Sequence, residues 1–152
     1  MKIDALLEMK GREVATVRPT AKLTSVVCRM KLARTGCVVV SEDDRHVDGI
    51  VAVRDIGYAL AEQGDAKLAM DQTAADIMTR SVRTCTPEDT LKSVMQTMTR
   101  WHVLNTPVLK DGVLHGIVNI DDVVRYAVAQ MDLESEVLHD DVLRMQTLKE
   151  LG

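Results

Sequence analysis

The sequence predicts an α/β fold in which one strand–helix–strand–strand–helix unit occurs twice. The stretch that begins at Val14 aligns with the stretch that begins at Val82, with several identical residues at matching places. Farther along, GIVAVRDI from Gly49 matches GIVNIDDV from Gly116. Apolar residues at helical spacing alternate with short β-branched runs in both copies. The two octapeptides therefore mark the same position in two copies of a single unit.

Composition limits the fold and the function. A chain of 152 residues can form one domain or two small halves with a common core, and its 46% hydrophobic content without Phe predicts an aliphatic core. A net charge of −4 argues against a nucleic-acid partner. The sequence has no run of about 18 apolar residues and begins with a polar segment. We therefore expect a cytoplasmic protein with no membrane partner.

The first half of each unit is expected to be a short strand, at 14–17 and at 82–85, and then a helix. In the second copy Thr86 is predicted to cap the helix, with Pro87 at its first position. Apolar residues at i, i+3, i+4 and i+7 predict one buried face on each helix. They are Leu23, Val26, Val27 and Met30 in the first copy, and Leu91, Val94, Met95 and Met98 in the second.

The second half of each unit is expected to be two strands and a helix. The strands are GCVVVS and NTPVLK, each followed by a turn and by the strand that begins at Gly49 or Gly116. The closing helices start near Asp55 and Asp122, and Gly64 is expected to end the first. A linker helix is predicted at Thr73–Asp76, and short helices at both chain ends. The C-terminal one rests on the spacing of Leu133, Val137, Leu138, Val142, Met145 and Leu148 within Asp132–Lys149.

No catalytic or metal motif stands out. Cys28, Cys37 and Cys85 lack a C-x-x-C spacing and are interpreted as reduced core thiols. The four histidines are scattered, and no glycine-rich phosphate loop occurs. A Cys–His nucleophile pair would need a reactive thiol, whereas cysteines in strands or on apolar helix faces are usually inert. The sequence therefore predicts no enzyme and no metal site.

The duplicated unit resembles the cystathionine-β-synthase (CBS) domain pair, or Bateman module. The matching stretches are VATVRPTAKL, GCVVV and GIVAVRDI in the first copy, and DIMTRSVRTCTPEDTL, NTPVLKDG and GIVNIDDVV in the second. The resemblance covers about residues 10–130 and is to the short stand-alone bacterial kind. It implies CBS domains at 8–65 and 76–132, related by a pseudo-twofold axis, and a helical tail at 133–152.

The same resemblance implies regulatory binding of an adenosine-containing ligand between the repeats. AMP, ATP, NADH and S-adenosylmethionine are the expected ligands; no cofactor is required, and the regulated partner protein is unknown. Asp55 and Asp122 are the main candidates, since one carboxylate can accept hydrogen bonds from both ribose hydroxyls. Ordinary helix capping is the competing interpretation of both aspartates.

The two copies depart differently from the family pattern. Three residues before each aspartate the family usually has Ser or Thr, where this chain has Ala52 and Asn119. Ala52 makes no side-chain hydrogen bond, whereas Asn119 both donates and accepts. Arg54 matches a basic residue that often faces phosphate in the family, and Asp121 takes that place in the second copy. We therefore expect two inequivalent clefts.

The remaining candidates match cleft-lining positions of the family, with plain core residues as the alternative. They are Thr16, Cys37 and Val38 in the first unit, and Val82, Thr84, Asn105, Thr106 and Pro107 in the second. Thr84 is the best of these, because a hydroxyl on an apolar strand needs a partner. We expect a homodimer, since the helix VVRYAVAQM carries more apolar surface than one neighbour covers. A protein-interaction scaffold with degenerate clefts is the rival to ligand sensing.

Overall fold

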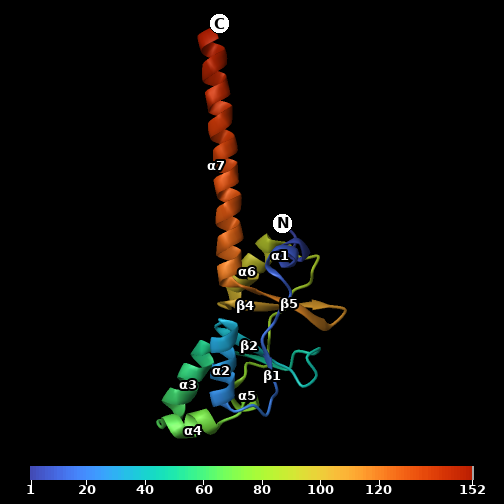
Figure 1. Cartoon of the computed structure of the whole chain (residues 1–152), viewed down its shortest axis with the longest axis vertical. Helices are drawn as coiled ribbons and strands as arrows, with labels where there is room; N and C mark the ends of the chain where they lie inside the picture. Colours follow the sequence, from blue (N-terminus) through green and yellow to red (C-terminus); the bar gives the residue numbers. More distant parts are fainter. Residues whose placement is uncertain (152) are drawn as a thin grey trace. The chain divides into compact units, whose positions relative to one another are not determined.

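The computed structural model describes the backbone of residues 1–151, and the side chains of residues 1–131 and 138–149. The chain divides into two units, Met1–Val118 and Asn119–Gly152. The elements in chain order (Figure 1) are α1 (Ile3–Lys10), β1 (Thr16–Val17), α2 (Leu23–Ala33), β2 (Cys37–Val40), β3 (Gly49–Ala52), α3 (Val53–Gln63), α4 (Ala66–Asp71), α5 (Ala74–Ile77), α6 (Leu91–Trp101), β4 (Asn105–Lys110), β5 (Val113–Asn119) and α7 (Ile120–Leu151).

The first repeat contains a three-stranded sheet in the order β1–β2–β3. β1 runs parallel to β2, and β2 runs antiparallel to β3 with Cys37 opposite Ala52. Val38, Val40 and Val51 belong to the buried core that also contains residues of α2 and α3. Because side chains alternate along a strand, Cys37 and Ala52 lie on the other face of the sheet. The helices therefore cover one face, and the predicted site residue Cys37 belongs to the opposite one.

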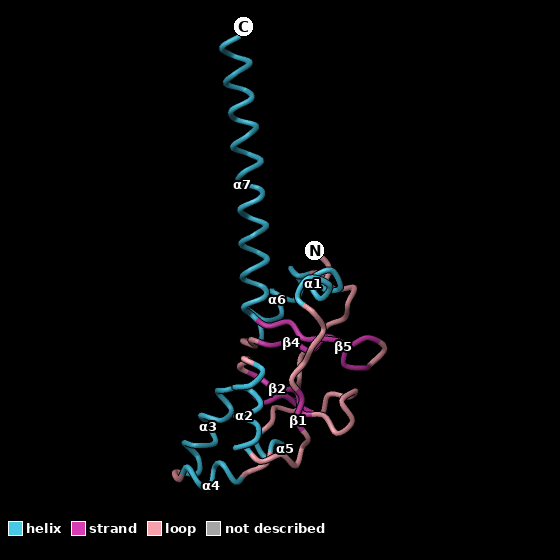
Figure 2. Tube along the Cα trace, viewed as in Figure 1, coloured by secondary structure: helices cyan, strands magenta, loops and turns pink. Residues whose placement is uncertain are grey.

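The second repeat has a smaller sheet, the hairpin β4–β5. Asp111 and Gly112 form its two-residue turn with φ angles of 53° and 76°, which confirms the turn predicted at KDG. The strand predicted at 82–85 is reduced to one parallel bridge between Cys85 and Val108. The strand prediction is therefore wrong for Val82 and Thr84. Figure 2 shows the two sheets as separate groups of strands.

Helix α6 begins later than its sequence indicates. Its N-cap is Thr90, whose Oγ1 accepts the N–H of Ser93, so the cap predicted at Thr86 is wrong. Long-range pairing explains the shift. The carbonyls of Pro87 and Asp89 accept the N–H groups of Asp4 and Ile3, at 2.9 and 2.8 Å. Residues 87–89 form a turn that pairs with the start of α1, and α6 begins only after Thr90.

The first repeat makes the same contacts with α5. The carbonyls of Pro19 and Ala21 accept the N–H groups of Ala75 and Ala74, at 2.9 and 2.8 Å. Each docking helix precedes one repeat in the chain and packs on the other: α1 lies with α6 and β5, and α5 with the first sheet (Figure 1). The matching contacts relate the two repeats as pseudo-symmetric copies. The linker helix has the predicted capping box between Thr73 and Asp76.

Helix α7 is longer than expected, because the closing helix of the second repeat and the predicted C-terminal helix form one helix of 32 residues. No glycine or proline occurs between Ile120 and Leu151 to end it. Of the residues on which the tail prediction rested, Leu133 and Val137 have side chains outside the described residues. Gly64 ends α3 as predicted, with φ 67° and its N–H on Leu60 O. Within the described residues, no helix is long and apolar enough to cross a membrane.

Candidate ligand-binding site

Asp55 and Asp122 occupy the same position in their repeats, the third residue of a helix that directly follows a strand. Oδ2 of Asp55 accepts the N–H of Ala52 at 2.8 Å, and Oδ2 of Asp122 accepts the N–H of Asn119 at 3.1 Å. Each carboxylate thus satisfies a backbone donor at the start of its helix. Asp55 is half-buried and Asp122 is buried.

The residues three positions before the two aspartates, Ala52 and Asn119, differ in whether they cap the helix that follows. Asn119 Oδ1 accepts the N–H of Asp122 at 3.0 Å, so this pair forms a reciprocal capping box. Ala52 has no side-chain acceptor, and only the Asp55 half of such a box exists in the first repeat. Within the described residues, Oδ1 of Asp55 has no hydrogen-bond partner. One oxygen of Asp55 is therefore available to a ligand hydroxyl.

Arg54 connects the two repeats. Its guanidinium Nη1 donates to the carbonyl of His102 at 3.2 Å, and His102 ends α6 in the left-handed conformation with φ 52°. The carbonyls at a helix C-terminus carry partial negative charge, so they attract a guanidinium. Arg54 is exposed. A guanidinium has five N–H donors, so Arg54 can donate to further acceptors besides the carbonyl of His102.

Thr16 is committed to the loop between β2 and β3. Its hydroxyl donates to Asp44 Oδ1 at 2.8 Å, and Arg18 binds both oxygens of the same carboxylate at 2.9 and 3.0 Å. The hydrogen bond from Arg18 holds the pKa of Asp44 below its usual value. The Thr16 hydroxyl therefore orders this loop. This structural role is an alternative to the predicted contact with a ligand.

Cys37 and Val38 lie in the buried strand β2. Cys37 is opposite Ala52, next to the start of α3 where Asp55 lies. Burial raises the pKa of the Cys37 thiol to about 11 and that of Cys85 to about 12. Both thiols are therefore neutral and unreactive near pH 7. Cys28 is exposed on α2, which contradicts the prediction that all three cysteines are core residues.

The second-repeat candidates divide into exposed and buried groups. Thr84 is exposed and outside any strand, so the argument that made it the best candidate is wrong. Val82 and Asn105 are half-buried, whereas Pro107 and Thr106 are buried. The Thr106 side chain is 1% exposed, and among the described residues its hydroxyl has no hydrogen-bond partner. A buried hydroxyl without a partner is uncommon and calls for a ligand or water.

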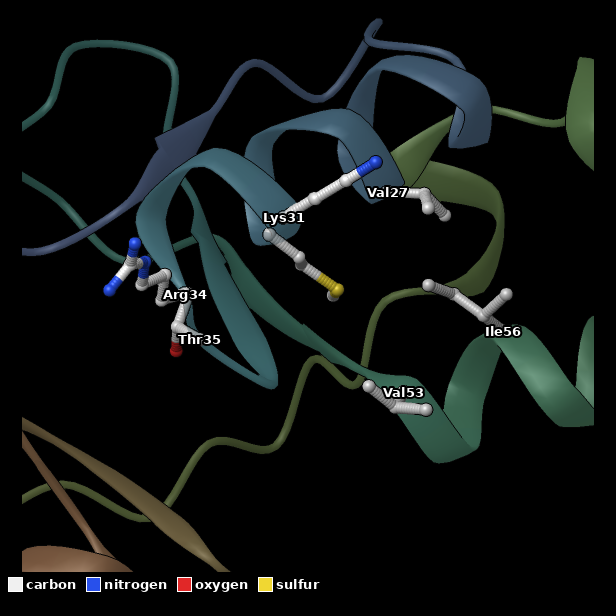
Figure 3. A pocket seen from close by; sticks show the side chains of 7 residues that line it. Val27, Lys31, Arg34, Thr35, Val53 and Ile56 are labelled. Atoms are coloured by element: carbon white, nitrogen blue, oxygen red, sulfur yellow. The ribbon is translucent and has the colours of Figure 1, made fainter.

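A pocket of about 450 Å³ lies between α2 and α3, on the helical side of the first repeat. Val27 of α2 and Val53 and Ile56 of α3 line it, together with Lys31, Arg34 and Thr35 near the end of α2 (Figure 3). None of the predicted site residues lines this pocket. The sequence predicts Val27 on a buried helix face, but Val27 is exposed, as is Met95 at the matching place in α6.

The structure brings some of the predicted residues together and separates others. Cys37, Ala52 and Asp55 gather at the junction of β2, β3 and α3, and Arg54 lies in the same helical turn. Thr16 pairs with Val39 farther along β2 and turns its hydroxyl to the loop. Among the described residues, no cluster of His, Cys, Asp and Glu side chains could hold a metal ion.

This architecture, two α/β repeats with exchanged docking helices in which the first strand of the second repeat is a single bridge, is that of a tandem CBS pair. The model of the CBS domain matches residues 8–62 and 74–129, and the chain belongs to the CBS-domain family. The CBS-domain containing protein ATU1752 of Agrobacterium tumefaciens has a similar crystal structure, with a TM-score of 0.78 and 32% identity. That match covers 84% of this chain and 99% of the other.

Two further relatives extend the comparison. The protein RP505 of Rickettsia prowazekii is 24% identical over 119 residues, which are 78% of this chain and 36% of that protein. This chain thus spans about a third of the length of that relative. The CBS domain protein PAE2072 of Pyrobaculum aerophilum, whose structure is of a complex with AMP, matches with a TM-score of 0.70 and 25% identity. That match covers 80% of this chain and 89% of the other.

Proposed function

We propose that this chain is a regulatory module that binds an adenosine-containing ligand and passes its occupancy to a partner protein. AMP, ATP, NADH and S-adenosylmethionine are the candidate ligands. The observation that carries the proposal is the matched pair Asp55 and Asp122, each at the third position of a helix and each with one oxygen on a backbone N–H. The AMP complex of the relative PAE2072 supports the ligand class.

The chemistry of a ribose fits such an aspartate. Its two neighbouring hydroxyls donate to an ionised carboxylate, and each charge-assisted hydrogen bond contributes about 1.5–3 kcal/mol. In the first repeat, Asp55 Oδ1 is the acceptor and Arg54 supplies donors for a phosphate. In the second, Asn119 keeps its amide N–H donors while its oxygen caps α7. We infer that the two sites differ in affinity and in preferred phosphate number.

The rival function is a scaffold whose ligand sites no longer bind. Two observations in the first repeat favour it: Ala52 offers no hydroxyl, and Arg54 already contacts the carbonyl of His102. A scaffold would use these residues only to hold the repeats together. The buried, unpartnered hydroxyl of Thr106 favours a ligand in the second repeat, because a relic site gains nothing from an unsatisfied polar group.

A thermal-shift panel of AMP, ADP, ATP, NAD(H) and S-adenosylmethionine tests the proposal. A ligand at about one hundred times its dissociation constant stabilises the fold by about 2.7 kcal/mol. For a domain of this size that is a rise of several degrees, at roughly 2–4 °C per kcal/mol. Unchanged melting with every ligand at millimolar concentration would support the scaffold and reject the sensor.

We also propose that the module forms a homodimer through its helical faces. Val53 and Tyr58 of α3 and Leu32 of α2 are more than half exposed, and the α2–α3 pocket lies beside them. Symmetric association would cover this apolar surface. The proposed limits of the parts are residues 8–65 and 76–132 for the two repeats, and 133–152 for the tail. Sedimentation of a Val53→Glu variant, compared with the unchanged chain, tests the dimer.

A further inference from the structure

The second half of α7 is additional to the CBS pair. The family match ends at residue 129, and 23 residues (152 − 129) follow it. The helix nevertheless continues to Leu151.

One face of α7 carries a heptad repeat of exposed apolar side chains. Met131, Leu138 and Met145 are seven residues apart and are 67%, 66% and 71% exposed. Val124 lies one heptad before Met131, and Val128 and Val142 lie four residues after Val124 and Leu138. These six residues, which we call the seam, are all more than one-third exposed. In heptad notation, Val128 and Val142 occupy a positions and the other four occupy d positions.

A strict heptad implies a helical partner. On a straight α-helix, positions seven residues apart drift by about 20° per heptad, so such a seam slowly winds around the helix. Only a second helix with the same repeat, in a left-handed supercoil, keeps the seam covered along its whole length. A flat surface or a single apolar pocket would cover one or two of the six side chains. A second copy of this chain has the required repeat by definition.

We propose that α7 of one copy packs along the seam against α7 of a second copy, in a parallel two-stranded coiled coil. Val128 and Val142 at a positions, together with Leu138 at a d position, match the pattern that favours two parallel strands.

The charges next to the seam agree with this arrangement. None of the six seam residues is charged, whereas Asp140 and Arg144 point to the outer positions f and c. In a parallel pair, a g position faces the e position five residues later in the other helix. Asp141 at g therefore faces Gln146 of the second copy, a carboxylate acceptor opposite an amide donor. Among the described residues, the g–e pairs place no like charges opposite each other.

This inference does not depend on nucleotide binding, and it differs from the proposed dimer through the helical faces of the repeats. Disulfide cross-linking separates the two dimers. In a parallel pair each d residue lies opposite its own copy, at a separation that a disulfide can span. A Leu138→Cys variant, made with Cys28→Ser to remove the exposed thiol, should form a covalent dimer under mild oxidation. Cys37 and Cys85 are buried and remain inert.

Leu143→Cys in the same background is the matched control. Leu143 is an exposed leucine five residues farther along the same helix, at a b position outside the seam. It should give little covalent dimer under the conditions that cross-link Leu138→Cys. Equal cross-linking of both variants, or cross-linking of neither, would overturn the parallel coiled coil. The second outcome is also the one expected if the seam binds a helix of another protein.

A pair of charge substitutions provides an independent readout. Leu138→Lys should weaken self-association by about tenfold or more, because each helix loses a buried leucine contact. Leu143→Lys adds the same charge outside the seam and should change it little. Sedimentation velocity over a range of concentrations measures both. If the two variants dissociate equally, the seam does not hold the two copies together.

Discussion

Leu7 of α1 packs directly on Gly116 of β5, and a Cβ added to this glycine would lie 2.8 Å from Leu7 Cδ2. Gly49 has the matching relation to Met78, whose Sδ would lie 2.6 Å from an added Cβ. Both glycines open the repeated G-I-V stretch. Packing therefore explains part of the repeated octapeptide. Each docking segment lies so close to its strand that only a glycine, whose side chain is a hydrogen, fits at the first position.

Gly116→Ala should destabilise the fold by about 1–3 kcal/mol, since Leu7 must move out of a tightly packed position. Urea unfolding followed by circular dichroism measures the change in the free energy of unfolding. Gly57→Ala is the control: Gly57 lies within α3, and a Cβ added there has nothing within 4 Å. That substitution should stabilise α3 by about 0.5–1 kcal/mol. A Gly116→Ala protein as stable as the unchanged chain would mean that α1 docks loosely.

Stability should fall between about pH 9 and pH 11 because of Cys37. Burial raises the pKa of the folded-state thiol to about 11, from a usual value of 9.0. The Cys37 thiol thus stays protonated to a higher pH in the folded chain than in the unfolded chain. The stability that this difference contributes is fully present below pH 9.0 and is lost as the pH rises through about 11. The loss should be about 2–3 kcal/mol. Urea unfolding at pH 8 and pH 11 tests this, and Cys37→Ala should show a shallower decline than Cys28→Ser.

Local signals made much of the fold predictable. Asp111 and Gly112 specify a two-residue turn, Gly64 ends a helix, and Thr73 caps one; each acts on its own neighbours in sequence. The start of α6 was not predictable in this way. Pro87 is a good first residue of a helix, but its carbonyl is bound by Asp4, more than eighty residues earlier in the chain.

In the candidate site, too, the features set by local sequence were predictable and those set by long-range contacts were not. The position of Asp55 and Asp122 near helix starts followed from the duplicated octapeptide, and the structure confirms both. The partners of Arg54 and Thr16 did not follow, because His102 and Asp44 lie 48 and 28 residues away in sequence. The prediction for Thr84 depends on a strand at 82–85, and in the structure only the bridge between Cys85 and Val108 remains of that strand.

Removal of residues 132–152 should leave a folded pair of repeats and weaken self-association. The family match ends at residue 129, and the seam residues Leu138, Val142 and Met145 are lost with the tail. The nucleotide response should persist, since neither Asp55 nor Asp122 is removed. Sedimentation and the thermal-shift panel, applied to the same truncated protein, measure the two properties. An unfolded product, or an unchanged dissociation constant, would exclude the tail from the dimer interface.

The last prediction separates the capping role of the aspartates from ligand binding. Asp55→Asn and Asp122→Asn keep an oxygen that can accept the N–H of Ala52 or Asn119, so the helix caps persist. Both lose the charge that strengthens hydrogen bonds from ribose. Asp55→Ala and Asp122→Ala remove the cap as well, at a cost of about 0.5–2 kcal/mol in stability. A ligand role predicts weak binding by all four variants; a cap role predicts instability of the two alanine variants alone.

Isothermal titration with adenosine, AMP and ATP measures the binding side of this comparison. Loss of two charged hydrogen bonds should cost about 3 kcal/mol or more, hence about a hundredfold in affinity at the altered site. Residual binding in Asp55→Ala should favour ATP and weaken with salt, because Arg54 still attracts phosphate. In Asp122→Ala the neighbouring residue is Asp121, so no such preference is expected. Unchanged affinity in every variant would mean that both aspartates are only helix caps, and that the repeated octapeptide reflects packing and capping alone.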